Sequence, residues 1–577
     1  MKLRFSILTL IVLLVAAGLT CRVSSPQPVP HNALTTGTST PQPRLAPLNT
    51  AFVKYIRLHQ ATRGQKADGL AGPRSSSLAP SPIDFSYLRD AKVQLDTATY
   101  PASYDLRKRG KLGPVKNQGH WGACWAFAAL GSLESRLLPS YHATFSEDNL
   151  VLGSGFSFAN PYEVGGTSLM ATAYLARWAG PISASEDAYG DSYTPAGLTA
   201  ERHVQEVLYL PPRGRPKDHA AAVIKWAVKK YGAVYASLYA DSGMTGSHDS
   251  SAYNAATASY CYIGAKNANH AVDIVGWDDK YSAANFSTKP DGNGAFIVRN
   301  SWGPKWGDGG YFYVSYYDTR IAVLGSPQGG ENDLNAVFDD VEPAGNFSGI
   351  YQYDPLGWTS AVGYPTGSTP DTAWFANSFI AESSDELAAV SFYTAELSSS
   401  YTVYVSASSL PSSTMTPCSS GSFSMPGYHT VTLASPVPLT SGQNFTVAVK
   451  LTTPGYDYPI PLETRIDGYT SGATSAPGES FVSPNGIDWT DLTTLPPNGQ
   501  TYYSSANVCL KAFTRAPGIP DSKCPAWKKV RSAATRSSPL RSCARPWTPR
   551  PICISSSEPM PSPRSVPGFA GRTCCAP

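Results

Sequence analysis

The spacing of hydrophobic residues divides the chain into segments of different structural type. From position 125 to 138 apolar side chains recur every three or four residues, which predicts a buried helix that starts near Cys124. We expect further helices at 168–178 and 219–230. β-branched and aromatic residues dominate four shorter segments, which we expect to be strands, at 234–239, 271–277, 294–300 and 310–316. This mixture predicts an α+β domain in the first half of the chain.

A different pattern begins after about position 345. Runs at 387–393, 401–405 and 445–451 alternate between apolar and polar residues, and turns rich in Gly, Pro and Ser separate them. Almost no helical period remains in this part of the sequence. We therefore predict an all-β sandwich of jelly-roll type at 345–514.

The N-terminal segments have the composition of export and linker sequences. A positively charged start precedes an apolar run from Phe5 to Leu19, which is shorter than the roughly 20 residues that span a bilayer. We expect residues 1–21 to be a signal peptide of a secreted or cell-surface protein, with lipid anchoring at Cys21 as an alternative. Residues 22–98 are rich in Pro, Ser, Thr and Gly, which predicts a propeptide or linker with little core of its own.

The C-terminal segment, residues 516–577, changes abruptly to Arg, Ser, Pro and Cys without periodicity. One interpretation is a disordered tail. The other is a slip of the reading frame near Ile519, so that the remainder is not a selected sequence. Resequencing of the gene distinguishes the two, because an unbroken frame would remove the second hypothesis.

Composition and charge narrow the class of protein. With 577 residues the chain exceeds the usual size of one hydrophobic core, so two or more domains are expected. Only 15% of the residues are charged, and 49 Gly and 49 Pro accompany 33 Tyr, which indicates an extracellular, loop-rich protein. The net charge of +3 is too small to indicate a nucleic-acid partner. Cys418 and Cys509 share the predicted β-domain, and a disulfide between them is considered.

One string, Asn117-Gln-Gly-His-Trp-Gly-Ala-Cys-Trp-Ala-Phe127, carries much of the chemical information. A thiol attacks as the thiolate, and a helix N-terminus lowers its ordinary pKa of about 8.5. Cys124 opens the predicted helix, so we expect it to be a nucleophile. The amide of Gln118 and the backbone N–H of Cys124 can point at a developing oxyanion. A lone Cys is more often a buried apolar residue, but its neighbours in this string favour the catalytic interpretation.

Two further residues complete a candidate catalytic set. His270 stands at the start of the predicted strand at 271–277, where it can act as the base. Asn300 ends another predicted strand, and its side-chain oxygen can accept the proton on the far nitrogen of His270. Trp302 follows closely and can cover that hydrogen bond from water. A structural histidine and a simple turn between strands are the alternatives for these positions.

These strings resemble those of the papain family of cysteine peptidases over about Tyr100 to Tyr317. The distance from Cys124 to His270 falls in the range of about 130–150 residues typical of such enzymes. The resemblance implies the nucleophile Cys124, the base His270, the orienting residue Asn300 and the oxyanion donor Gln118. It also implies a two-lobed catalytic domain, a helical lobe plus a β-barrel-like lobe, at 99–340.

The same resemblance extends to substrate binding. Gly165 and Gly166 match the glycine pair that binds the substrate backbone as an added strand. Ser168, Ala268 and Asn269 would border the main side-chain pocket. No metal or organic cofactor is expected.

The sequence departs from the family at two places. Papain-type enzymes usually have a Cys three residues before the nucleophile, bonded to a Cys just ahead of the glycine pair. Trp121 and Glu163 stand at these places. Because both partners are absent together, the loss suggests a prokaryotic branch and not a damaged enzyme.

The β-rich block resembles the lectin-like domain that follows some prokaryotic papain-type catalytic domains, by its position, length and strand pattern. Its implied ligand is a carbohydrate or a cell-surface molecule. The function expected for the whole chain is that of a secreted cysteine endopeptidase that acts on protein or peptide substrates. The expected mechanism pairs a Cys124 thiolate with a His270 imidazolium, oriented by Asn300, and passes through a thioester acyl-enzyme. The alternatives are a catalytically inert surface adhesin and a transpeptidase that uses the same residues.

Overall fold

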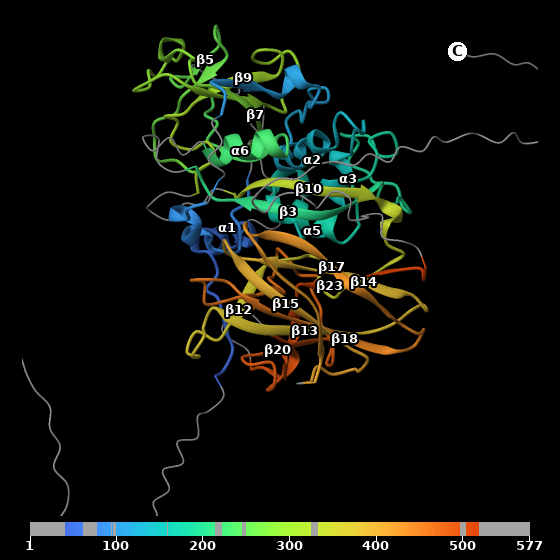
Figure 1. Ribbon diagram of the computed structural model, residues 1–577. Helices are drawn as coiled ribbons and strands as arrows, with labels where there is room; N and C mark the ends of the chain where they lie inside the picture. The colour runs from blue at the N-terminus through green and yellow to red at the C-terminus, as the bar shows by residue number, and fades with distance from the viewer. Residues whose placement is uncertain are drawn as a thin grey trace, which may run out of the picture. The chain divides into compact units, whose positions relative to one another are not determined.

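The structure, a computed structural model, describes most of the chain (Figure 1). The described residues are 41–61, 78–93, 95, 100–158, 160–213, 222–244, 250–324, 333–412, 414–496 and 503–518. The signal peptide predicted at 1–21 and all of the predicted tail after residue 518 lie outside them. Among the described residues no helix has the length and apolar character needed to cross a membrane.

The helical lobe is built around α2, Cys124–Leu137, in which every residue from Cys124 to Ser135 is buried. A helix that is buried on all sides occupies an interior position, and α2 contacts both other helices and strands. Short helices surround it: α3 (Glu147–Leu152), α4 (Pro161–Val164) and α5 (Ser168–Ala176). The hydroxyl groups of Ser146 and Thr167 accept backbone N–H groups at the starts of α3 and α5, which fixes where these helices begin.

The second lobe is an antiparallel sheet in which the predicted strands are confirmed. β7 (His270–Asp278) pairs with β4 (Val234–Leu238) on one side and with β8 (Ala295–Arg299) on the other, and β9 (Tyr311–Ser315) follows β8. Helix α6 (Ala222–Lys230) contacts β4 and β7. The remaining strands of this domain are β2 (Ser103–Asp105), β3 (Arg202–Leu210), β5 (Tyr253–Asn254), β6 (Ser259–Tyr260) and β10 (Asn335–Pro343).

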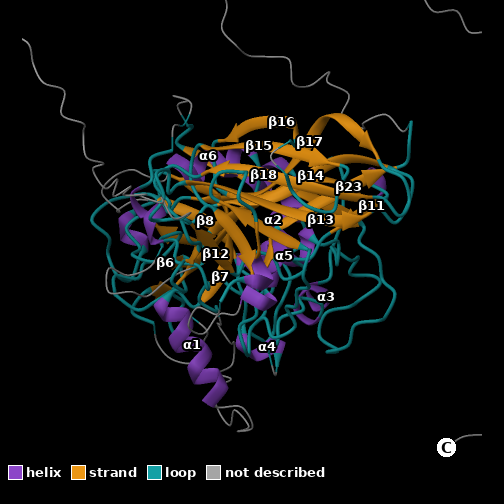
Figure 2. Ribbon diagram, turned by 90° about the horizontal axis from the view of Figure 1, so that it is seen from below, coloured by secondary structure: helices purple, strands orange, loops and turns teal. Residues whose placement is uncertain are grey.

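The block after β10 is an all-β sandwich, as predicted (Figure 2). Its strands are β11 (Gly349–Tyr351), β12 (Ser360–Gly363), β13 (Thr372–Ile380), β14 (Glu386–Thr394), β15 (Ser399–Ser406), β16 (Thr416–Phe423), β17 (Gly427–Pro438), β18 (Asn444–Thr452), β19 (Ile460–Glu463), β20 (Ser480–Ser483), β21 (Thr490–Asp491), β22 (Asn507–Val508) and β23 (Leu510–Arg515). One sheet has the order β16-β15-β18-β13-β20-β21, while β11, β23, β14 and β17 pair in that order in another. Buried side chains of both sheets, such as Phe375 and Val390, share one hydrophobic cluster.

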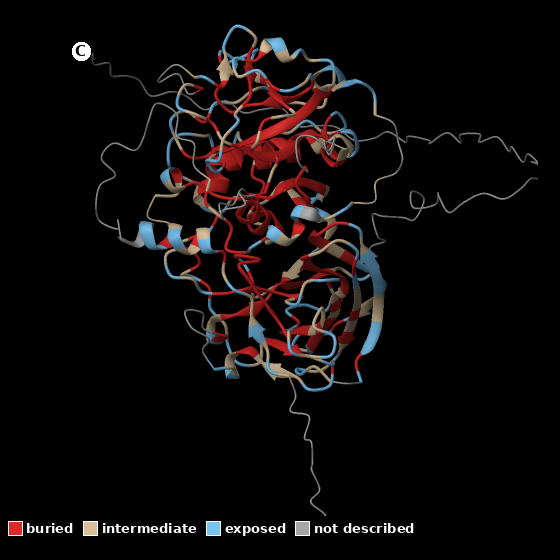
Figure 3. Cartoon of the chain, turned by 90° about the vertical axis from the view of Figure 1, so that its left-hand side faces the viewer, coloured by how far each residue is buried: buried red, intermediate tan, exposed pale blue. Residues whose placement is uncertain are grey.

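The two domains share a sheet. Gly427–His429 at the start of β17 pairs antiparallel with Glu206–Leu208 of β3, and β3 in turn pairs with β10. Neither β3 nor this pairing was predicted from the sequence, and the pairing joins strands over 200 residues apart, which leave no local signal. The continuous interior that results is drawn in red in Figure 3.

The segment predicted to have little core of its own contains a helix that packs against the rest of the chain, a contact that was not predicted. The short apolar patch of this segment lies in helix α1 (Thr50–Ala61), where Phe52 and Ile56 are 1% and 7% exposed. β1 (Arg44–Leu45) pairs with β12 of the sandwich. The apolar patch is buried against the rest of the chain, which composition alone does not reveal.

The disulfide considered between Cys418 and Cys509 is not formed. Cys418 lies in β16 at the edge of the six-stranded sheet, whereas Cys509 is buried between β22 and β23 of the other sheets. A shared domain therefore did not bring the two sulfur atoms together.

Candidate active site

Cys124 is the first residue of α2 and is fully buried. The residue before it, Ala123, provides no side-chain cap, so the helix dipole acts at this end without a competing hydroxyl or carboxylate. The backbone N–H of Ala271 donates a hydrogen bond to the Cys124 sulfur at 3.4 Å. The sulfur thus lies against the residue that follows His270, although 147 positions separate them in the chain.

His270 and Asn300 are brought together by the pairing of β7 with β8. His270 begins β7, Asn300 follows the end of β8, and the distance from His270 Nε2 to Asn300 Oδ1 is 2.8 Å. The same oxygen also accepts the backbone N–H of Ser301 at 2.8 Å, which fixes the orientation of the carboxamide. An oxygen acceptor at Nε2 places the proton on that nitrogen and leaves Nδ1 as the basic atom.

Trp302 covers this histidine. Its ring stacks on the His270 ring with centroids 4.7 Å apart and planes at 27°. His270 has no exposed surface, and burial lowers the pKa of its imidazole to about 4, against the opposing effect of the Asn300 hydrogen bond. In this closed arrangement the imidazole is therefore neutral at pH 7.

Gln118 is held between the two lobes. Its backbone N–H donates to the Ser301 carbonyl at 2.8 Å, and its side-chain Oε1 accepts the Ser301 hydroxyl at 2.6 Å. The amide nitrogen donates to the Trp121 carbonyl at 2.7 Å. Ser301 therefore orients the amide. This residue was not predicted from the sequence, and its position next to Asn300 was the available signal.

We predict that Gln118→Ala lowers kcat for peptide hydrolysis by about 100- to 1000-fold, because an oxyanion donor is lost. Gln118→Glu keeps the shape but removes the donor, so it should lose a similar factor. The measurement is steady-state kinetics on the activated chain. If KM rose by a similar factor while kcat stayed the same, an oxyanion role for Gln118 would be contradicted.

The two glycines of the pair are required for different reasons, a left-handed backbone at Gly165 and a lack of space at Gly166. Gly165 has φ 78°, and a Cβ on Gly166 would clash with the ring of Trp125. The segment predicted to be a propeptide or linker occupies this edge in the structure: Leu78 forms a parallel bridge with Gly166, and the N–H of Ala79 donates to the Gly166 carbonyl at 3.3 Å. The edge can thus pair with an extended peptide.

The three predicted pocket residues differ in their freedom to face a substrate. Ser168 is buried, and its backbone N–H and hydroxyl donate to the Asp333 carboxylate at 2.6 and 2.9 Å. The side chain of Asn269 exchanges hydrogen bonds with the backbone of Ala240 at the end of β4. Ala268, which precedes it, is 9% exposed.

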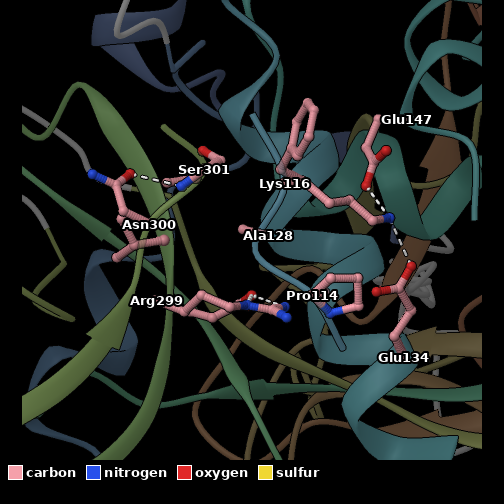
Figure 4. Close-up of a pocket in the computed structure, with 13 residues that line it drawn as sticks. Pro114, Lys116, Ala128, Glu134, Glu147, Arg299, Asn300 and Ser301 are labelled. Carbon is pink, nitrogen blue, oxygen red and sulfur yellow. Dashed lines mark hydrogen bonds and ion pairs between the residues drawn. The ribbon is translucent and has the colours of Figure 1, made fainter. Parts of the chain in front are cut away.

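Two charged clusters line a cavity behind the predicted catalytic residues, between α2 and the strands β7 and β8 (Figure 4). In one, the Lys116 amine lies 2.8 Å from Glu134 and 2.6 Å from Glu147. In the other, the guanidinium of Arg299 lies 2.6 Å from the Asp273 carboxylate, and both side chains are buried. Sequence reasoning missed both clusters. The available signal for the Arg299–Asp273 cluster was one charged residue of each sign, Asp273 and Arg299, in two predicted strands that are otherwise apolar.

A third acidic group lies apart from the residues assigned to catalysis. Asp148, Asp187 and Asp191 bring one carboxylate oxygen each within 4.8 Å of one another, a spacing that a metal ion could use. None of these three is among the predicted catalytic residues.

Comparison with known proteins agrees with this geometry. A family model described as papain family cysteine protease matches residues 100–323, and one described as lectin like domain matches residues 350–514. A cathepsin L-like peptidase of Aedes aegypti is 31% identical over 274 residues, which span 46% of this chain and 69% of the relative. Cathepsin K of Gallus gallus is 30% identical over 257 residues, or 43% of this chain and 66% of that protein.

Two solved structures resemble both domains. The cysteine protease and lectin-like domains of Cwp84, a surface layer associated protein of Clostridium difficile, superpose with a TM-score of 0.64 at 24% identity, covering 83% of this chain and 99% of that one. The clostridial cysteine protease Cwp84 after propeptide cleavage gives a TM-score of 0.59 at 25% identity, covering 72% and 99%. The predicted α+β catalytic fold and all-β lectin-like domain are confirmed.

Proposed function

Since the chain belongs to the papain family of cysteine proteases, we propose that it is an exported endopeptidase that hydrolyses peptide bonds with Cys124 and His270 as its reacting groups. The observation that carries the proposal is the convergence of three distant residues. The N–H of Ala271 contacts the Cys124 sulfur, and the neighbouring His270 ring is held by Asn300 at 2.8 Å.

The chemical steps follow from the roles of these atoms. Nδ1 of His270 takes the thiol proton, and the Cys124 thiolate attacks the substrate carbonyl carbon. The tetrahedral oxyanion accepts hydrogen bonds from the Gln118 amide and the Cys124 N–H. The imidazolium then protonates the leaving amine, which leaves a thioester on Cys124. Water, deprotonated by His270, hydrolyses this thioester and releases the acid product.

The described chain is an inactive precursor in this proposal. Leu78 and Ala79 occupy the Gly166 edge, and both Cys124 and His270 are fully buried. A substrate can pair with that edge only after the prosegment has left. The similar clostridial protease Cwp84 has been solved in a form that follows propeptide cleavage, which supports such a step.

A peptide-library cleavage assay tests the activity. The full-length chain is incubated until its N-terminal segment is processed, and products are sequenced by mass spectrometry. Hydrolysed peptides support the proposal, whereas joined peptides indicate the transpeptidase alternative. If the N-terminal segment is not removed during the incubation, it is cleaved off with an added protease, and absence of any product after that step would leave only the inert adhesin.

Acid is expected to weaken the closed form. The ordinary pKa of His is about 6.5, and the buried His270 has a pKa of about 4. Between these values the unfolded chain binds a proton that the folded chain does not, so stability falls as the pH drops from 6.5 toward 4, by up to roughly 3 kcal/mol.

Thermal unfolding of the Cys124→Ala chain between pH 7 and 4 measures this effect. The matched control, His270→Gln in the same background, lacks the titrating group but keeps a polar side chain. The melting temperature should fall more steeply with acid in the chain that has His270. Parallel curves would contradict the assignment.

Export and surface location extend the proposal. The apolar run from Phe5 to Leu19 supports a signal peptide, and the related Cwp84 is described as surface layer associated. The lectin-like domain is proposed to bind a carbohydrate or cell-surface ligand. N-terminal sequencing of the exported chain checks the first point, because a start beyond residue 21 is expected.

A further inference from the structure

A loop of the lectin-like domain reaches the catalytic domain close to the substrate edge. The loop, residues 466–473, carries Tyr469, which is 1% exposed. The N–H of Ser157 donates to the Tyr469 carbonyl at 2.7 Å, and the N–H of Ser471 donates to the Ser157 hydroxyl at 3.1 Å. Backbone and side-chain hydrogen bonds thus fix the loop against the helical lobe.

The Tyr469 ring forms an aromatic pocket with two residues of the catalytic domain. Its centroid lies 4.8 Å from that of Phe156 and 5.8 Å from that of Phe158. Its hydroxyl interacts with the side chain of Thr167. Thr167 directly follows Gly166, so the pocket adjoins the edge to which an extended peptide pairs.

The pocket is filled by the prosegment in the described chain. Phe52 of α1 meets the Tyr469 ring edge-on, with centroids 4.9 Å apart and planes at 74°, and is itself 1% exposed. The hydroxyl of Tyr55, one turn further along α1, donates to the Val164 carbonyl at 2.7 Å. One segment therefore occupies both the Gly166 edge and the aromatic pocket.

We propose that Tyr469, Phe156 and Phe158 form a subsite for a large apolar side chain of the substrate polypeptide once the prosegment has left. The lectin-like domain then supplies part of the substrate-binding surface of the peptidase. The occupant is identified by what fills the pocket now, a phenylalanine ring in edge-to-face contact. The inference rests on the proposed peptidase function and names a feature of its substrates.

The position of the favoured residue follows from the chain geometry. Successive residues of an extended peptide advance about 3.3 Å each. Because the Tyr469 hydroxyl meets Thr167, the neighbour of Gly166, the side chain that enters the pocket belongs to a residue within about three places of the one paired with Gly166. Short peptides that end at the Gly166 edge do not reach it.

The test compares peptides of two lengths on the full-length chain after it has processed its own prosegment. The short peptide ends at the residue that pairs with Gly166. The long peptides extend it by three residues, with Phe or Ser placed at each added position in turn. We expect one added position at which Phe raises kcat/KM about 10-fold over Ser, mainly through KM.

Variants then assign that preference to the pocket. Tyr469→Ala should lower the Phe-to-Ser ratio toward one, and Tyr469→Phe, which keeps the ring, should preserve it. Phe158→Ala, at the half-buried rim of the pocket, should also lower the ratio and replaces Tyr469→Ala if that variant does not fold. Tyr404→Ala removes an aromatic side chain from a different cluster of the same domain and should leave the ratio unchanged.

Two results would overturn the inference. The first is the same kcat/KM for Phe and Ser at every added position in the unaltered chain. The second is a Phe preference that persists in Tyr469→Ala and Phe158→Ala. Either result leaves the peptidase proposal standing as long as the short peptide is hydrolysed, whereas failure of the peptidase proposal means no hydrolysis of either length.

Discussion

Replacing Cys124 with alanine is expected to reduce peptide hydrolysis by on the order of 10⁵-fold or more, because the nucleophile is lost. The side chain is small and lies at the start of α2, so the fold should persist. Steady-state kinetics on the processed chain, with circular dichroism to verify the fold, measures the change. The variant must be processed in trans by the active chain, since it should not process itself.

Cys261 offers a matched control for this prediction. It is also buried, and burial raises the pKa of its thiol to about 12, so it is protonated at neutral pH. Cys261→Ala should retain activity. If Cys124→Ala kept substantial hydrolysis, or if Cys261→Ala abolished it, the assignment of the nucleophile would be wrong.

Replacing Arg299 with methionine is expected to destabilise the folded chain by about 3–5 kcal/mol. The Asp273 carboxylate, 3% exposed, would lose the guanidinium that lies 2.6 Å away. A buried carboxylate without its partner is costly because the apolar interior does not solvate it. Urea unfolding of the Cys124→Ala chain and of the same chain with Arg299→Met gives the difference.

The double variant Asp273→Leu with Arg299→Met is the control, since it removes both charges. It should recover much of the stability, because apolar side chains tolerate this interior position. If Arg299→Met lowered the free energy of unfolding by less than about 1 kcal/mol, water would have to reach the Arg299–Asp273 pair. The interior between α2 and the strands β7 and β8 would then be accessible to solvent.

Gly131→Ala tests the packing of α2 against the same ion pair of Arg299 and Asp273. Helix propensity alone predicts that alanine stabilises an interior helical position by about 1 kcal/mol. A Cβ at Gly131, however, would clash with the Arg299 guanidinium and the Asp273 carboxylate, which hold each other in place. We therefore expect Gly131→Ala to lower the free energy of unfolding, opposite to the effect of helix propensity. Urea unfolding in the Cys124→Ala background measures the difference.

The sequence was sufficient for the features that local patterns determine. The helix at Cys124, the strand that begins at His270 and the strand that ends just before Asn300 were predicted close to their observed bounds, because each has a clear hydrophobic pattern. The catalytic strings resemble a known family, so the residues brought together at the site could be named in advance. Their roles remain predictions that the variants above test.

Features that depend on distant contacts could not be predicted. The pairing of β17 with β3, the contact of Phe52 with Tyr469 and the packing of Gly131 against Arg299 each join segments far apart in the sequence. No local pattern marks such a partner. The considered disulfide between Cys418 and Cys509 was wrong for the same reason, since membership of one domain does not fix the distance between two side chains.

Labelling with an epoxysuccinyl thiol probe, mapped by mass spectrometry, measures directly whether Cys124 is an activated thiol. In the processed chain at neutral pH, we expect the probe to modify Cys124 rapidly and to leave the buried Cys261 and Cys509 unmodified. His270→Ala should slow the reaction at Cys124 by orders of magnitude. Equal labelling of Cys124 and Cys261, or a rate at Cys124 that does not depend on His270, would contradict a thiol activated by its neighbouring imidazole.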